Sequence, residues 1–137
     1  MPIVDKIKGN VLETDCLHIC FAINIQGDNS RGFSGIIARE YWPDIEKTKK
    51  MMLGETIGWK CGSITFHGLV CYSLDQVHGW DETPDAVTKC LNSLSIPDDE
   101  VIAIVRIGEG GGREEDIEGG IARSNKNVVI YRNYFNF

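Results

Sequence analysis

The segment NIQGDNSRGFSGII, residues 24–37, directly follows the apolar run LHICFAI and contains three glycines, an aspartate and an arginine. The run before it is rich in β-branched and aromatic residues, which predicts a buried strand. The apolar residues at its end predict a helix. A glycine-rich segment at such a junction is either a surface turn or a cradle for a phosphorylated ligand, because glycine lets the backbone approach a phosphate closely.

Other strands and helices are expected to alternate along most of the chain. Apolar runs typical of strands are ITFHGLVCYSL (64–74), VIAIVRI (101–107) and VVIYR (128–132). TIGWKCG (56–62) would pair with the 64–74 run as a hairpin, and VDKIKGNVL (4–12) would supply an edge strand at the N-terminus.

The helices are expected between these strands. TPDAVTKCLNSL (83–94) has Thr83 as N-cap, Pro84 in the first turn and apolar residues at three- and four-residue spacing. GIIAREYW (35–42) should end at Pro43, DIEKTKKMM (44–52) should resume the helix, and REEDIEGGIARS (113–124) should form another. This order predicts the α/β class: a three-layer α/β/α sandwich with a mixed, mainly parallel central sheet.

Length and composition limit the class of protein. With 137 residues, of which 42% are apolar, we expect a single domain over residues 1–137. No membrane span or secretory signal is evident, so a cytoplasmic protein is expected. Five cysteines without a C-x-x-C pair indicate buried reduced thiols rather than disulfides or zinc. A net charge of -6 argues against a general nucleic-acid binder.

A second glycine-rich segment, GEGGGR (108–113), follows the strand expected at 101–107 and precedes a predicted helix. In open α/β sheets, ligands bind beyond the carboxyl ends of the strands. Two glycine-rich loops at that edge, each followed by the N-terminus of a helix, would grip a diphosphate from opposite sides. Their pairing favours the phosphate cradle over two ordinary turns.

Side chains near these loops suit a nucleotide. Asn24 and Asp28 can exchange hydrogen bonds with ribose hydroxyls, although capping of the turn is the alternative role for both. Arginines at 31, 106 and 113 can offset phosphate charge, with plain surface solvation as their alternative. Tyr131 can stack on a base or simply pack the last strand. No cofactor or metal site is expected, and His18 and His67 are expected to be structural residues.

The order of these motifs resembles that of macrodomains, which bind ADP-ribose. KGNVLETD is similar to the family's opening K-G-D segment, and FAIN to the strand that closes with asparagine. GDNSRGFSGIIAREYWP resembles the glycine-rich first loop and helix, LGETIGWKCGSITFHGLVCYSL the "LG" hairpin of one subgroup, and VRIGEGGG its P-R-I-G-x-G second phosphate loop. The resemblance covers almost the whole chain.

The resemblance implies a ligand site. Asn10 would take the place of the adenine-contacting aspartate, and Asn24 and Asp28 would lie by the distal ribose, where they would position a water if the protein is a hydrolase. Two loops would form the walls of the diphosphate site. The residues expected to bind substrate are therefore Asn10, Ser30, Arg31, Gly32, Phe33, Ser34, Gly35, Ile36, Arg106, Gly108, Gly110, Gly111, Gly112 and Tyr131.

Departures from the family pattern leave the activity open. Asn10 brings no charge to the adenine, and Val105 replaces the proline before Arg106. No lysine lies in residues 72–75, and glycines at 111 and 112 replace the aspartate, although the hydrolases that cleave ADP-ribose from glutamate use both. Phe21 stands where the ADP-ribose 1''-phosphate phosphatases have histidine.

The leading hypothesis is binding of ADP-ribose, of a close derivative or of an ADP-ribosylated protein. Whether the protein also acts as an ADP-ribosyl hydrolase or phosphatase is left open. The alternatives are a non-catalytic interaction domain with a degenerate site, in which Phe33 or Arg31 fills the diphosphate position, and a binder or hydrolase of another nucleotide.

Overall fold

A computed structural model of the chain describes residues 3–29, 32–47, 51–73, 82–105 and 114–132. Its elements, in order, are β1 (Ile3–Ile7), the 3-10 helix η1 (Val11–Glu13), β2 (His18–Asn24), α1 (Gly32–Glu40), the 3-10 helix η2 (Pro43–Lys47), β3 (Thr56–Cys61), β4 (Ile64–Tyr72), α2 (Thr83–Ser93), β5 (Val101–Val105), α3 (Glu114–Ala122) and β6 (Asn127–Tyr131).

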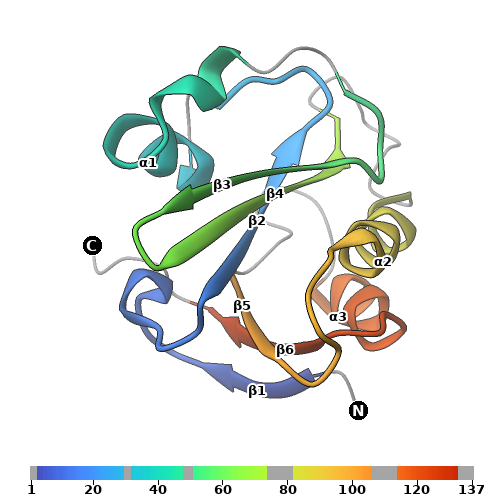
Figure 1. Cartoon of the computed structure of the whole chain (residues 1–137). Helices are drawn as coiled ribbons and strands as arrows, with labels where there is room; N and C mark the ends of the chain where they lie inside the picture. The colour runs from blue at the N-terminus through green and yellow to red at the C-terminus, as the bar shows by residue number, and fades with distance from the viewer. Residues whose placement is uncertain (1–2, 30–31, 48–50, 74–81, 106–113, 133–137) are drawn as a thin grey trace.

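The strands form one six-stranded sheet in the order β1-β6-β5-β2-β4-β3. All neighbouring pairs are parallel except the β3–β4 hairpin. Helix α1 lies on one side of the sheet, and α2 and α3 lie together on the other (Figure 1). The predicted α/β class, the mixed and mainly parallel sheet, the hairpin and the edge strand at the N-terminus are thus confirmed, whereas the single-domain organisation of residues 1–137 stays a prediction.

The two sides of the sheet carry two separate cores, because successive side chains of a strand point to opposite faces. In β2, Ile19, Phe21 and Ile23 are buried against α1 and η2, whereas Cys20 is buried among residues of α2 and α3. The central strands are therefore apolar on both faces, as expected when helices cover both sides of a sheet.

Some helix boundaries differ from the sequence predictions. Helix α1 begins at Gly32 rather than Gly35 and ends at Glu40, after which Pro43 opens the 3-10 helix η2 instead of a longer α-helix. In α2, Glu82 rather than Thr83 is the N-cap residue. The stacked indoles of Trp42 and Trp59, with ring centroids 5.9 Å apart, join the end of α1 to the outer strand β3.

Within the described residues, no helix has both the length and the apolar character that crossing a membrane requires.

Candidate functional site

The carboxyl ends of five strands meet at one edge of the sheet, because β1, β6, β5, β2 and β4 all run parallel. Ligands of open α/β sheets bind beyond this edge. The residues that end these strands are Ile7, Tyr131, Val105, Asn24 and Tyr72. We refer to this side of the sheet as the carboxyl edge.

The two glycine-rich segments leave the sheet from adjacent strands. Strand β2 pairs with β5 in parallel, with Cys20 opposite Ile104, so both strands point toward the carboxyl edge. The first segment leads into α1 at Gly32, and the second leads into α3 at Glu114. Several of the expected binding residues lie outside the described residues, namely Ser30, Arg31, Arg106, Gly108, Gly110, Gly111 and Gly112.

Asn24, at the end of β2, holds the turn that follows it. Its side-chain Oδ1 accepts a hydrogen bond from the Asp28 amide at 3.0 Å, and its Nδ2 donates to the Asp28 carbonyl oxygen at 2.7 Å. The side chain of Asn24 is buried, whereas Asp28 is exposed to solvent. The structure therefore shows the turn-capping role for Asn24, and contact of either residue with a ribose stays a prediction.

Asn10 and Tyr131 lie at the other end of the carboxyl edge. Asn10 caps η1 by accepting the Leu12 amide at 3.0 Å on its side-chain oxygen. The Tyr131 hydroxyl donates to Thr14 Oγ1, just after η1, at 3.0 Å. The Tyr131 bond thus fixes the segment between β1 and β2 against the end of β6, whereas the Asn10 bond closes a turn within that segment.

Phe33, Ser34, Gly35 and Ile36 form the first turn and a half of α1. The first three are buried and Ile36 is half-buried. The Phe33 ring packs edge-on against Phe21 in the core, with ring centroids 5.7 Å apart. Its ring is therefore part of the packing between α1 and the sheet.

Two residues of the first loop that sequence reasoning did not single out have defined roles. Gln26 Nε2 donates to Ser73 Oγ at 2.9 Å, and Asn29 Nδ2 donates to the Ile45 carbonyl oxygen at 3.0 Å. Asn29 is almost completely buried, with 3% of its surface exposed. The only sequence signal for either role was an amide side chain within a glycine-rich turn, because Ser73 and Ile45 are distant from that turn in sequence.

His18 and His67 form a pair on the α2 side of the sheet, away from the carboxyl edge. His18 Nδ1 and His67 Nε2 are 2.9 Å apart and share a hydrogen bond, and Glu100 lies 3.7 Å from the other nitrogen of His18. Burial, with a smaller contribution from His18, lowers the pKa of His67 to about 4. The pair is therefore structural, as the sequence suggested.

All five cysteines have free thiols, and three of them are buried together between the sheet and α2. Burial raises the pKa of Cys90 to about 12 and also raises the pKa of Cys20 and Cys71. A thiol that stays protonated is neither a nucleophile nor a metal ligand. These cysteines therefore contribute packing rather than chemistry.

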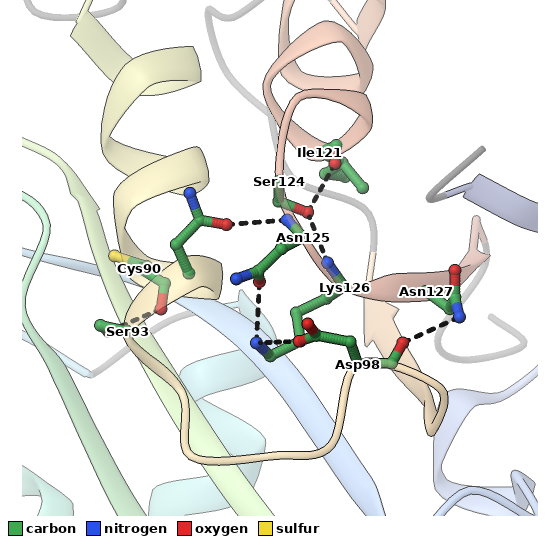
Figure 2. A network of polar contacts seen from close by, with 9 residues as sticks. Cys90, Ser93, Asp98, Ile121, Ser124, Asn125, Lys126 and Asn127 are labelled. Atoms are coloured by element: carbon green, nitrogen blue, oxygen red, sulfur yellow. Dashed lines mark hydrogen bonds and ion pairs between the residues drawn. The ribbon is translucent and has the colours of Figure 1, made fainter.

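At the opposite, amino edge of the sheet, a polar network joins the ends of α2 and α3 to the start of β6 (Figure 2). Lys126 Nζ, 2% exposed, donates to Asn125 Oδ1 at 2.8 Å and pairs with Asp98 at 3.2 Å. Asn127 Nδ2 donates to the Asp98 carbonyl oxygen at 2.9 Å. The network links the loops of this edge to one another, at the end of the sheet opposite the carboxyl edge.

Comparison with known proteins identifies the fold by structure alone. No protein-family model matches the chain, and no curated protein matches its sequence. Among solved structures, the macrodomain of Mycobacterium tuberculosis DarG superposes with a TM-score of 0.68 at 17% identity, covering 94% of this chain and 96% of that one. A macrodomain protein from Streptomyces coelicolor gives a TM-score of 0.71 at 14% identity, with 96% and 99% covered.

A mutant of the Oceanobacillus iheyensis macrodomain, solved with ADPR, gives a TM-score of 0.68 at 15% identity, covering 96% of this chain and 84% of that one. These likenesses span nearly the whole of each chain.

Proposed function

Because this chain has the macrodomain fold, we propose that it binds ADP-ribose or a close derivative at the carboxyl edge of its sheet. One observation carries the proposal. Two glycine-rich segments leave adjacent parallel strands, β2 and β5, and each is followed at once by a helix. Main-chain amides of both segments would then face a shared anion, and the N-termini of α1 and α3 would add their positive dipole ends.

Backbone amides suit this chain as phosphate ligands. Its net charge of -6 would repel a polyanion, but a diphosphate held by N–H groups does not require a basic surface. Residues 30–36 would form one wall of the diphosphate site and residues 108–112 the other, with Arg31 and Arg106 offsetting charge.

The positions of Tyr131 and Asn24 favour a ligand that extends along the carboxyl edge. Tyr131 ends β6 and Asn24 ends β2, and these strands are separated by two strand spacings in the sheet, or about 10 Å at ~4.8 Å per spacing. In the proposed orientation, Asn10 and Tyr131 lie near the adenine, whereas Asn24 and Asp28 lie near the distal ribose.

Binding is favoured over catalysis by the hydrogen bonds of Asn24. Both ends of its amide hold the backbone of Asp28, so the side chain is fixed in a structural role. One amide hydrogen and one lone pair are left by these two bonds for a ligand or a water. Hydrolysis of an ADP-ribosyl or 1''-phosphate bond would therefore depend on the exposed Asp28 as the group that orients a water.

Isothermal titration with ADP-ribose tests the proposal directly. Gly32→Glu and Gly110→Glu should each abolish the heat of binding, because a carboxylate in either loop would repel the diphosphate. Gly119→Glu is the matched control, since an added side chain there meets nothing within 4 Å. No heat from the folded wild-type protein at millimolar ADP-ribose would disprove the proposal.

A thermal-shift panel separates the alternatives. Ligands that bind only the folded state raise the melting temperature. Stabilisation by ADP-ribose, but not by NAD, cyclic ADP-ribose isomers or mononucleotides, supports the leading proposal. Stabilisation by another member of the panel indicates a different nucleotide, and stabilisation by none indicates an interaction domain with a degenerate site. An ADP-ribosylated peptide tests whether the ligand is carried by a protein.

A further inference from the structure

The loop between β2 and α1 is hydrogen-bonded to two other parts of the protein, the end of β4 and the 3-10 helix η2. The first fastening is the side-chain hydrogen bond from Gln26 Nε2 to Ser73 Oγ, at 2.9 Å. Ser73 directly follows β4, the strand next to β2, and is buried. Beside it, the Ile25 amide donates to the Tyr72 carbonyl oxygen at 3.0 Å. The exits of β2 and β4 are thus tied together.

The second fastening is at the other end of the described loop. Asn29 Nδ2 donates to the Ile45 carbonyl oxygen at 3.0 Å and more weakly to the Gly27 carbonyl oxygen at 3.4 Å. Ile45 belongs to η2, which follows α1, and both Asn29 and Ile45 are buried. A buried carbonyl oxygen that loses its hydrogen-bond donor and is not reached by water is destabilising. The bond from Asn29 to Ile45 therefore opposes movement of the loop away from η2.

Between the two fastenings, the Asn24 side chain closes the turn on the backbone of Asp28. The loop is therefore bound to the end of β4 on one side, to η2 on the other, and to Asn24, the last residue of β2, in between. Each of these three contacts involves a side chain of residues 24–29. The backbone of Gly27, at a φ of 74°, adopts a conformation that glycine tolerates and other residues rarely adopt.

We propose that Gln26 and Asn29 are positioning residues that hold the loop after β2 in its ligand-binding conformation before any ligand arrives. This inference rests on the proposed function, since the loop leads into the first wall of the diphosphate site. A ligand that meets an ordered loop does not spend binding free energy on ordering it. Loss of either fastening lowers the population of the binding-competent loop, and the apparent affinity falls in proportion.

The test compares Gln26→Ala, Asn29→Ala and wild type by isothermal titration with ADP-ribose. Each variant is expected to bind about 10-fold more weakly, or about 1.4 kcal/mol, with the loss appearing as a less favourable entropy of binding. Asn127→Ala is the matched control. It also removes an asparagine Nδ2 bond to a backbone carbonyl, that of Asp98, but at the amino edge, and should leave the dissociation constant unchanged.

Hydrogen exchange of the Asp28 amide supplies a readout that does not depend on the ligand. This amide donates to Asn24 Oδ1 in the closed turn, so release of the loop should speed its exchange about 10-fold in both loop variants and not in the control. Equal exchange rates in wild type and loop variants would overturn the inference, as would equal affinities.

The remaining outcomes separate this inference from the proposed function. Wild-type protein that fails to bind ADP-ribose overturns both the proposed function and the claim that the loop is set for that ligand. Wild-type protein that binds, with loop variants that bind equally well, overturns the inference alone. If Asn29→Ala does not fold, Gln26→Ala decides, because its bond is only partly buried.

Discussion

Two consecutive glycines in α3 provide a sharp test of how the helices on one side of the sheet pack. A Cβ built at Gly120 would overlap the Pro84 carbonyl oxygen of α2 and lie 3.0 Å from Pro84 Cα. A Cβ at Gly119 would meet nothing within 4 Å. The two helices therefore touch through backbone at Gly120, where Thr88 Oγ1 also donates to the Gly120 carbonyl oxygen at 2.5 Å.

The perturbation is alanine at each position in turn. Gly119→Ala should stabilise the protein by about 0.5–1 kcal/mol, because alanine loses less backbone entropy than glycine in a helix. Gly120→Ala has the same gain but must force α2 and α3 apart, at a cost of about 1–3 kcal/mol. Since the helix-propensity gain is common to both variants, the difference between their free energies of unfolding isolates the cost of that contact.

Urea unfolding followed by tryptophan fluorescence measures this difference, with the stacked pair Trp42 and Trp59 as one source of signal. We expect Gly120→Ala to unfold at lower urea than Gly119→Ala with an unchanged slope. In a thermal scan, the gap corresponds to about 4 °C per kcal/mol for a chain of this size. Equal stability of the two variants, or a more stable Gly120→Ala, would refute the close packing of the two helices.

Three further predictions concern charge, ligand and thiols. The unfolded chain protonates His67 near pH 6.5 but the folded protein only near pH 4, so stability should fall as pH drops through that window. After allowance for solvent screening, the loss is about 1–2 kcal/mol, and it should shrink in His67→Gln when urea unfolding is repeated at pH 7 and pH 4.5. Gly32→Glu should abolish the stabilisation by ADP-ribose in a thermal-shift assay. The melting temperature of the ligand-free variant should fall by no more than about 2 °C. Equal stabilisation of variant and wild type by ADP-ribose would contradict this prediction. The buried thiols of Cys20, Cys71 and Cys90 should react with iodoacetamide at least about 10-fold more slowly than the two half-buried thiols, as peptide mass spectrometry can measure, and comparable rates would count against their burial.

The sequence predicted the sheet well, because its strands are strongly patterned. Runs at 17–23 and 101–107 are apolar on both faces, and they became the central strands β2 and β5. The glycine and proline positions marked the junctions between strands and helices. Such signals are local, so each strand or junction can be predicted from its own short segment of sequence.

The start of α1 was less predictable. Gly32 disfavours a helix by intrinsic propensity, and the sequence predicted that the helix starts only at Gly35. In the structure, burial of Phe33 against Phe21 stabilises an additional turn at the N-terminus of the helix. Here tertiary packing outweighs the preference of the individual residues.

The long-range side-chain contacts, both at the candidate site and elsewhere in the sheet, could not be predicted. Gln26 and Ser73 are 47 residues apart in sequence, and His18 and His67 are 49 apart. Such pairs form only because β2 and β4 become neighbours in the sheet, and nothing in either segment alone indicates its partner. The turn-capping bond of Asn24 was foreseen as an alternative, since its partner is only four residues away.

Because Lys126 is buried, its reactivity can report when the corner between α3 and β6 opens. Its ammonium group is shielded by Asn125 and Asp98, so an amine-acylating reagent can reach it only when the corner between α3 and β6 comes apart. The exposed Lys60 would react at once and serve as an internal standard. The rate of acylation at position 126 would thus measure how often this end of the protein opens transiently, without an engineered probe.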